Sequence, residues 1–323
     1  MSILEVKDLK VSFNTVMGKV EAVKGVDLSV NSGEVLGIIG ESGSGKSVTS
    51  LAIMGLIDNR SGAVESGEIL FEGKNLINLT EKEMCKIRGD KISMIFQEPM
   101  TSLNPVVTIY KQLREVYKIH RPDKKNNCKE ELVELLSKLN IPDPKSVLNK
   151  YPFELSGGLK QRIMIAMAMI CKPSLIIADE PTTALDVTTQ AEIINLLKSI
   201  KDESNSGIML ITHDLGVIAE MAQKVVVMYY GKVVEECSVS EFFDNAMHPY
   251  SKDLLGAMPE NFNGRFQSIE GNVPNLYEDI KGCAYYKRCK RRIAKCENSK
   301  PPMITIKENH KIRCFKYEKG DEK

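Results

Sequence analysis

Hydrophobic and polar positions alternate at the start of this chain and then change period. The first segment places apolar residues at Leu4, Val6, Leu9, Val11 and Phe13. A similar alternation returns from Val23 to Val30, and both segments therefore read as antiparallel β-strand. Val35 to Ile39 is instead a continuous apolar run, which is typical of a strand that is buried in a parallel sheet. A glycine-rich loop follows it, and a helix is expected from about Ser47.

The remaining pattern alternates helices with buried strands. From Glu98 to about Arg162 the period is helical and the residues are more polar, as in an insertion of different character. Short apolar runs at Leu175–Ala178 and Ile208–Thr212 predict two further core strands, and Val225–Glu235 predicts a hairpin that turns at Gly231. Between the two core strands a helix carries one apolar face, formed by Ile193, Ile194, Leu196, Leu197 and Ile200. Such alternation predicts an α/β fold with a mainly parallel sheet, beside an antiparallel β subdomain and a helical subdomain.

After about His248 the pattern gives way to a tail rich in proline, lysine and cysteine. We therefore expect two domains, residues 1–247 and a C-terminal extension over residues 248–323. No internal repeat is evident.

Composition narrows the class of partner. Among the 323 residues, 44 basic side chains face 43 acidic ones, so no overall field favours nucleic acid or anionic lipid. The N-terminus lacks the basic patch and apolar run of a signal peptide. The most apolar stretch, Ile163 to Ala178, is interrupted by Lys172 and Pro173 and is expected in the core. A cytosolic protein is predicted, with any membrane role carried by a partner.

The glycine-rich loop fits the phosphate-binding pattern G-x-x-x-x-G-K-[ST] in full. Its residues are Gly40, Glu41, Ser42, Gly43, Ser44, Gly45, Lys46 and Ser47. Glycines let successive backbone N–H groups surround phosphate oxygens, and the following helix adds its positive N-terminal dipole. Lys46 is expected to reach the β- and γ-phosphates of ATP, and the Ser47 hydroxyl to bind Mg²⁺.

Two acidic residues end the second core strand. Leu175–Ala178 leads directly into Asp179 and Glu180. Because strand ends of a parallel sheet face its ligand-binding edge, Asp179 is expected at Mg²⁺. Glu180 is then the candidate for polarising the attacking water.

Between these two motifs, Leu155–Arg162 resembles the signature sequence of ABC transporter ATPases, which are P-loop NTPases. Other motifs of that family follow in order: Gln97 matches the Q-loop, Ala184–Asp186 the D-loop, and His213 the switch histidine. Phe13 lies where the family carries its adenine-stacking aromatic residue. The resemblance covers about residues 1–245. It implies that Gln97 assists catalysis and Mg²⁺ binding, that His213 takes part in hydrolysis, and that Asp186 lies at the nucleotide.

The same resemblance implies a head-to-tail dimer. In such a dimer, Ser156, Gly157 and Gly158 of one subunit contact the γ-phosphate that the other subunit binds. The partner is expected to be a second ABC ATPase subunit, giving a heterodimer in the cell, although an isolated chain could pair with itself. Binding of ATP would close the dimer and hydrolysis would let it open.

Three segments resemble one branch of the family, the dipeptide and oligopeptide importers. They are Glu41–Lys46, Gln97–Pro105 and His248–Lys252. This resemblance implies a peripheral subunit on the cytoplasmic face of the membrane. It would bind transmembrane permease subunits directly and serve an extracytoplasmic peptide-binding protein indirectly. Importers of nickel or other small solutes share the branch and remain an alternative.

Cysteines are unevenly distributed. Four are scattered and are expected to be buried thiols, Cys85, Cys128, Cys171 and Cys237. Four crowd into the tail, namely Cys283, Cys289, Cys296 and Cys314. In a reducing compartment such a cluster indicates metal rather than disulfides.

The tail cysteines resemble the set with which several peptide-importer ATPases bind a [4Fe–4S] cluster, and four thiolates are the ligands that such a cluster needs. A Zn²⁺ site and unligated thiols are the alternatives. Between Lys281 and Lys300 lie eight basic residues and one acid, Glu297, a surround expected to lower the thiol pKa values.

Two other classes of ABC protein are alternatives. A soluble ABC ATPase acting on nucleic acid usually carries two cassettes or a long coiled coil, whereas this chain has one cassette and no sustained heptad. Only its basic, cysteine-rich tail favours that class. Exporters often fuse the cassette to membrane helices, and the sequence contains no such run. The importer interpretation, with no nucleic acid as partner, is therefore preferred.

Overall fold

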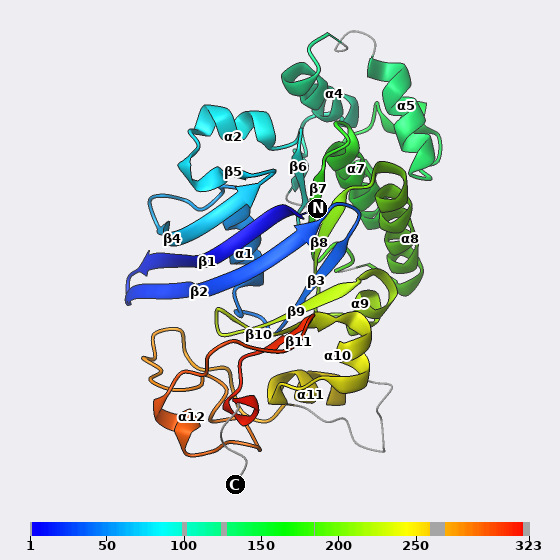
Figure 1. Cartoon of the computed structure of the whole chain (residues 1–323). Coiled ribbons are helices and arrows are strands. Elements are labelled where there is room, and N and C mark those ends of the chain that lie inside the picture. The colour runs from blue at the N-terminus through cyan, green and yellow to red at the C-terminus, as the bar shows by residue number, and fades with distance from the viewer. Residues whose placement is uncertain (1, 99–101, 124–127, 184, 259–268, 319–323) are drawn as a thin grey trace. The chain divides into compact units, whose positions relative to one another are not determined.

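The computed structural model describes residues 2–98, 102–123, 128–183, 185–258 and 269–318 (Figure 1). The chain forms two compact units. Unit 1 comprises residues 31–33 and 78–210, and unit 2 comprises residues 2–30, 34–77 and 211 onward.

Unit 2 contains the predicted antiparallel sheet, with strand order β2-β1-β4-β5. The strands are β1 (Ser2–Thr15), β2 (Gly18–Asn31), β4 (Gly62–Phe71) and β5 (Lys74–Asn75). The register of β1 against β4 shifts between Lys7 and Lys10, where Asp8 has a positive φ of 42°. This irregularity explains why the apolar alternation skips from Val6 to Leu9, since both side chains still face the core.

A second set of strands in unit 2 has the order β3-β9-β10-β12-β11. They are β3 (Val35–Ile39), β9 (Lys224–Tyr229), β10 (Lys232–Ser238), β11 (Ile304–Lys307) and β12 (His310–Ile312). β3 pairs parallel with β9, and β9 turns through Tyr230 and Gly231 into antiparallel β10. The buried parallel strand and the hairpin at Gly231 are thus confirmed. The helices of this unit are α1 (Lys46–Ile53), α9 (Leu215–Met221), α10 (Val239–Asn245), α11 (Pro249–Gly256) and α12 (Lys295–Asn298).

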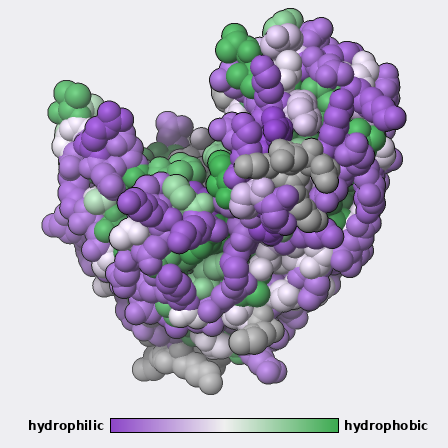
Figure 2. Space-filling model, turned by 90° about the horizontal axis from the view of Figure 1, so that it is seen from above, coloured by the Kyte–Doolittle hydropathy of each residue, from purple (hydrophilic) through white to green (hydrophobic). Residues whose placement is uncertain are grey.

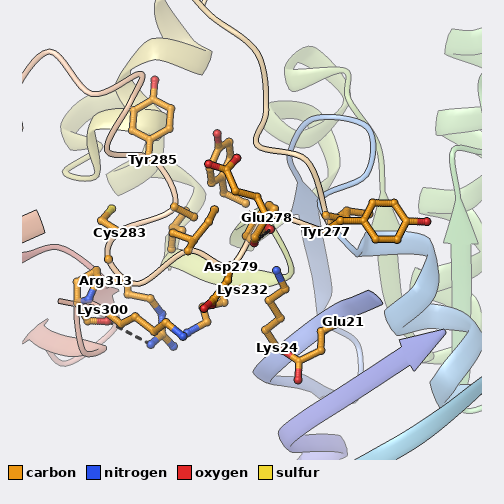
Figure 3. Close-up of a pocket in the computed structure, with 18 of the residues that line it drawn as sticks. Glu21, Lys24, Lys232, Tyr277, Glu278, Asp279, Cys283, Tyr285, Lys300 and Arg313 are labelled. Carbon is orange, nitrogen blue, oxygen red and sulfur yellow. Dashed lines mark hydrogen bonds between the residues drawn. The ribbon is translucent and has the colours of Figure 1, made fainter. Parts of the chain in front are cut away.

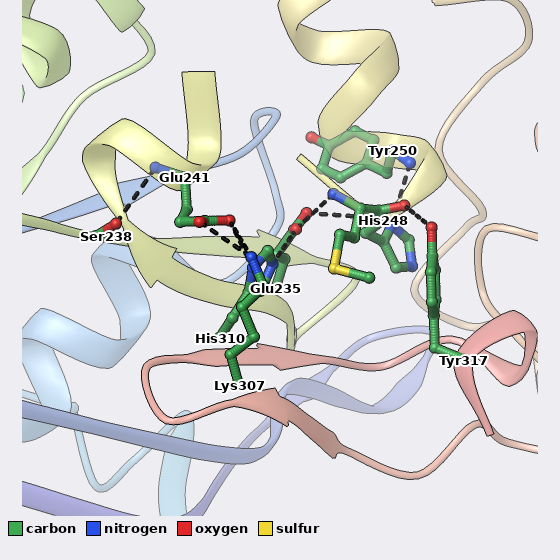
Figure 4. Close-up of polar contacts among 9 residues, drawn as sticks. Glu235, Ser238, Glu241, His248, Tyr250, Lys307, His310 and Tyr317 are labelled. Atoms are coloured by element: carbon green, nitrogen blue, oxygen red, sulfur yellow. Dashed lines mark hydrogen bonds and ion pairs between the residues drawn. The ribbon is translucent and has the colours of Figure 1, made fainter. Parts of the chain in front are cut away.

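The strands β11 and β12 were not expected from the sequence. They place the end of the tail beside β10, as the red ribbon in Figure 1 shows. The His310 side chain of β12 lies 2.7 Å from the Glu235 carboxylate of β10, and both are buried. Glu235 also accepts the backbone N–H groups of Met247 and His248 (Figure 4). One buried carboxylate therefore joins the hairpin to the start of α11, and its neighbours satisfy its oxygens.

Unit 1 contains parallel strands in the order β8-β7-β6 and the predicted helical insertion. The strands are β6 (Ile92–Ile95), β7 (Leu175–Asp179) and β8 (Gly207–Ile211). The helices are α2 (Glu81–Ile87), α4 (Ile109–His120), α5 (Cys128–Lys138), α6 (Pro144–Val147), α7 (Gly157–Met169) and α8 (Val187–Ser204). All five apolar residues that were expected on one face of α8 are buried. The interrupted stretch from Ile163 supplies buried residues of α7 and β7, as expected of core.

Within the described residues, the structure contains no helix with the length and apolar character that crossing a bilayer requires. Figure 2 shows one face of the molecule, on which hydrophilic residues predominate and hydrophobic ones gather in limited patches.

Candidate functional site

The glycine-rich loop of unit 2 joins the end of β3 to the start of α1. Gly40, at a φ of 151°, passes so close to β9 that a Cβ there would lie 2.2 Å from the carbonyl oxygen of Met228. Gly45 is the N-cap residue of α1 and has a φ of 102°. It has no side chain with which to cap the helix, so the first N–H groups of α1 are left for another acceptor.

Lys46 is folded back over this loop. Its ammonium group donates to the carbonyl oxygens of Gly40 at 2.7 Å and Glu41 at 3.1 Å. The hydroxyl of Ser44 is buried and has no hydrogen-bond partner among the described residues. A buried hydroxyl of this kind fits a ligand that brings its own acceptors, as a phosphate does. Ser42 and Gly43 are exposed at the tip of the loop, and Ser47 is half-buried on the first turn of α1.

Two other predicted residues belong to unit 2. His213 is exposed directly after Thr212, whose N–H donates to the carbonyl oxygen of Ile38 in β3. This bond holds the histidine segment beside the strand that leads into the phosphate loop. Phe13 lies on β1 opposite Gly62, and a Cβ on that glycine would approach the ring to 2.6 Å. The half-exposed Phe13 ring therefore packs against the backbone of Gly62, and its exposed face is accessible to another contact.

Gln97 and Glu180 meet in unit 1. β6 and β7 run parallel, with Ile95 opposite Ala178, so the residues after both strands reach the same edge. There the side-chain amide of Gln97 donates to the Glu180 carboxylate at 3.1 Å, and the Thr183 hydroxyl donates to the same oxygen at 2.8 Å. Asp179 is buried at the end of β7. Thr183 is a contact of this site that the sequence analysis did not identify.

The signature segment begins α7 in the same unit. Ser156 caps this helix by accepting the N–H of Leu159, and Ser156 and Gly157 are exposed. A Cβ on Gly158 would lie 2.8 Å from Thr189 of α8. Asp186, the N-cap residue of α8, accepts the N–H of Thr189 at 3.0 Å, and these bonds lower the pKa of its carboxyl. The signature and the Asp186 segment therefore lie together.

Part of two predicted motifs lies outside the described residues. This applies to Ala184 of the Ala184–Asp186 segment and to residues 99–101 of the Gln97–Pro105 stretch.

The tail contacts the phosphate loop through side chains that the sequence did not single out. Arg288 forms a two-pronged ion pair with the Glu41 carboxylate, at 2.6 and 3.0 Å. The Tyr250 hydroxyl accepts the N–H of Glu41 at 2.8 Å. Arg288 is buried against the rings of Tyr229 and Tyr285, and its hydrogen bonds to Glu41 raise its pKa despite this burial. The His248–Lys252 segment, first noted as a family feature, thus supplies a direct contact to the loop.

Replacing Arg288 with methionine is expected to destabilise the protein by about 1–3 kcal/mol, because a buried charge-assisted pair loses one partner. The measurement is the free energy of unfolding in urea, with Arg292→Met, an exposed tail arginine, as the matched control. Equal stability of the two variants would show that the pair contributes nothing to the fold.

The four tail cysteines gather around one small cavity of about 20 Å³. Cys283 and Cys296 are also joined through their backbones, since the Cys283 N–H donates to the Cys296 carbonyl at 2.8 Å. No three of the four sulfurs lie within 4.8 Å of one another in the described chain. Four ligands of one Zn²⁺ ion stand about 3.8 Å apart, because each Zn–S bond is about 2.3 Å. No three of the sulfurs therefore stand at the mutual distances of a preformed zinc site.

The prediction that the basic surround lowers the pKa values of these thiols is wrong. Burial raises the pKa of Cys283 to about 12, and it raises the pKa values of Cys289 and Cys314 as well. The neighbouring thiols raise them further, and desolvation outweighs the nearby arginines and lysines. Bound metal would have to displace these protons.

The scattered cysteines are buried with one exception. Cys128, Cys171 and Cys237 are buried as expected, whereas Cys85 is exposed on α2. The exposure of Cys85 on a short helix could not be predicted from its isolated position in the sequence. Cys237 lies with Glu235 and His310 in a group with close ligand atoms. Glu235 already accepts three hydrogen bonds there, so this group is adequately explained as a buried structural contact.

The oxygens of Ser47, Gln97 and Asp179 are a hydroxyl, an amide carbonyl and a carboxylate, which are the ligand types that suit Mg²⁺. The donor set thus fits the expected metal. For the four thiols, soft sulfur ligands suit iron–sulfur chemistry or zinc.

Residues 23–183 match the family described as ABC transporter, and residues 234–296 match the oligopeptide/dipeptide transporter C-terminal region. The chain is 45% identical over 319 residues to the oligopeptide transport ATP-binding protein AppD of Bacillus subtilis, covering 98% of this chain and 97% of that protein. It is 46% identical over 315 residues to the dipeptide transport ATP-binding protein DppD of the same organism, covering 97% and 94%.

Solved structures with a similar fold include the dimeric structure of MJ0796, a bacterial ABC transporter cassette. The TM-score is 0.62 at 29% sequence identity, covering 73% of this chain and 98% of that one. The post-hydrolysis structure of the same cassette, bound to ADP and phosphate, matches with a TM-score of 0.62 at 28% identity over 73% and 98%.

Proposed function

Because this chain belongs to the ABC transporter family, in the branch of oligopeptide and dipeptide transport ATP-binding proteins, we propose that it hydrolyses ATP to energise peptide import. The observation that carries this proposal is the phosphate loop of unit 2. This loop contains Lys46, the uncapped start of α1 and the unpartnered Ser44 hydroxyl. Such a loop binds the phosphates of a nucleotide.

In the proposed reaction, Lys46 neutralises charge on the β- and γ-phosphates, and Ser47, Gln97 and Asp179 hold Mg²⁺, which would further neutralise that charge. Glu180 orients a water molecule whose oxygen forms a bond to the γ-phosphorus while the bond to ADP breaks. Gln97 and Thr183 already hold the Glu180 carboxylate. His213 assists at the γ-phosphate, and Phe13 stacks on adenine. These roles rest on the family resemblance and on the local geometry of each unit.

We further propose that two ATPase subunits enclose the nucleotide, with Ser156, Gly157 and Gly158 of each contacting the ATP of the other. The dimeric cassette MJ0796 supports this arrangement. Ser156 and Gly157 are exposed, as a surface for a partner must be. A second ATPase of the same branch, giving a heterodimer, is the proposed partner, with Asp186 near the shared interface.

The proposed location is the cytoplasmic face of the membrane, where transmembrane permease subunits bind the ATPase and an extracytoplasmic binding protein delivers peptide. Co-expression with the permease subunits of a peptide importer, followed by purification from membranes, tests this assignment. Retention on the permeases together with peptide-stimulated ATP hydrolysis is expected. Stimulation of ATP hydrolysis by a nickel complex instead of peptide would show that the chain serves a nickel importer.

For the tail we propose a [4Fe–4S] cluster bound by Cys283, Cys289, Cys296 and Cys314. The four thiols line one cavity, and no three of their sulfurs lie within 4.8 Å of one another in the described chain. A cluster has about four irons between the thiolates, which suits wider spacing. Zn²⁺ is the competing occupant.

Protein prepared without oxygen is expected to be brown and to contain about four irons per chain. Cys289→Ser should remove the colour while nucleotide binding by the phosphate loop persists. Cys128→Ser, which alters a buried thiol of unit 1, is the control and should keep both colour and iron. Colourless protein with one zinc per chain would identify a zinc site, and metal-free protein would remove both assignments.

A further inference from the structure

A second cavity, larger than the one at the cysteines, lies within unit 2 (Figure 3). Its volume is about 340 Å³, which falls in the range of small-molecule sites. β2, the β9–β10 hairpin and several stretches of the tail form its walls. It is separate from the phosphate loop, none of whose residues line it.

Five basic residues line this cavity, and four of them have no acidic partner within 4.0 Å among the described residues. The four are Lys24, Lys232, Lys300 and Arg313. Figure 3 shows Lys232, Lys300 and Arg313 gathered on one side, with Lys24 projecting toward the middle. The fifth, Lys19, is exposed and pairs with Glu65 at 2.9 Å.

Three acidic residues also line the cavity. Glu21, Glu278 and Asp279 are all exposed, whereas Lys24, Lys232 and Arg313 are partly buried. Glu278 already has a lysine partner, Lys287. Three of the four cations without an acidic partner are therefore less exposed than the acids, whereas Lys300 is exposed as well. Arg313 is also held in place, because its guanidinium donates to the carbonyl oxygen of Val233 at 2.9 Å.

This arrangement costs free energy when the cavity holds no anion. Burial lowers the pKa of Lys24 to about 8, and the charges of Lys232 and Lys300 lower it further, against an opposing effect of Glu21. The pKa of Lys232 is likewise lowered by burial and by its cationic neighbours. Cations brought together without acidic partners are unfavourable for the fold alone, and such sites are commonly functional.

From this geometry we infer that the cavity binds a small phosphorylated anion, with Lys232, Lys300 and Arg313 contacting the phosphate. Clustered lysine and arginine donors match the several oxygens and the negative charge of a phosphate group. The rings of Tyr229, Tyr230 and Tyr285 line the same space and can pack against the organic part of the ligand. The ammonium group of Lys24 lies 3.3 Å from the centre of the Tyr230 ring, which holds it toward the cavity.

Inorganic pyrophosphate is the probe for this site. Calorimetry is carried out on the Lys46→Ala variant, so that phosphate binding by the glycine-rich loop does not contribute. One pyrophosphate should bind per chain at physiological salt. Lys232→Gln should weaken binding by about tenfold, and Lys232→Gln with Lys300→Gln by about a hundredfold, if each cation contributes one charge-assisted contact.

Lys19→Gln is the matched control, because Lys19 lines the cavity but already has a carboxylate partner. It should change the affinity for pyrophosphate by less than about twofold, within the range of an exposed ion pair. The melting temperature of each variant shows whether it is folded, and Lys232→Gln should melt no lower than its parent because it removes repulsion. Lys300 is exposed, so Lys300→Gln alone supplies a test if the double variant unfolds.

Four results would overturn the inference. They are no pyrophosphate binding in the millimolar range, equal affinities in the Lys232 and Lys19 variants, tighter binding of dialanine than of pyrophosphate, or tighter binding of citrate than of pyrophosphate. Tighter binding of dialanine would indicate a zwitterionic peptide that uses the acidic residues as well as the cations. Citrate serves as the polycarboxylate comparison, and stronger binding of citrate would assign the site to carboxylates instead of phosphates.

Discussion

Glu180→Gln is expected to lower steady-state ATP hydrolysis by about 10²–10³-fold, because the amide cannot accept a proton from the attacking water. Glutamine has nearly the shape of glutamate and keeps an oxygen that can accept from Thr183 and Gln97. Binding of ATP should therefore persist, and dimers should accumulate in the ATP-bound state. Phosphate release and nucleotide affinity are measured on the same preparation.

Glu203→Gln is the control for this variant, since Glu203 is exposed at the far end of α8. Its rate should equal that of the unaltered chain. If Glu180→Gln hydrolysed ATP at an unchanged rate, the base would have to be another residue. If it no longer bound ATP, the carboxylate would be needed for nucleotide binding instead.

Ser156→Arg is expected to prevent ATP-dependent dimerisation and to reduce hydrolysis to the level of a monomer, at least about a hundredfold lower. The added bulk and length would lie in the closed interface of the proposed dimer. ATP binding by the single chain should change little, because Ser156 and the phosphate loop act on different nucleotides in that dimer. Sizing chromatography with ATP and the Glu180→Gln background gives the readout.

The Ser156 side chain also caps α7, so loss of the cap must be separated from loss of the interface. Ser156→Asp keeps a capping oxygen but places a negative charge against the γ-phosphate, and it should also prevent dimerisation. Ser146→Arg, at an exposed serine of unit 1, is the control for added arginine. ATP-dependent dimers in both Ser156 variants would contradict the head-to-tail arrangement.

Much of the fold could be predicted because its signals are local. The continuous apolar run of β3, the alternation in β1 and the single apolar face of α8 each follow from side-chain spacing within one element. The hairpin at Gly231 was predictable for the same reason. The β11–β12 hairpin was not, because its strands are short and charged, and pairing with β10 across the chain stabilises them.

The candidate site likewise has a part that local sequence predicts and a part that depends on contacts between distant residues. The phosphate loop is a contiguous motif whose backbone provides the chemistry, and so its residues could be named from sequence alone. The contact between Arg288 and Glu41 joins residues 247 positions apart. No local sequence pattern predicts such a pair. No local pattern predicts that Lys232, Lys300 and Arg313 line one cavity either.

The tail cysteines show the physical reason most plainly. Their number, spacing and basic surround were visible in the sequence and indicated a metal site, but counted charges predicted lowered thiol pKa values. Burial instead raises them, since removal from water disfavours the thiolate more than neighbouring cations favour it. Sequence alone determined the elements, the phosphate loop and the family features. Tertiary structure decided burial, the long-range ion pair and the cationic cavity, because solvent exposure and through-space distance arise only once the chain has folded.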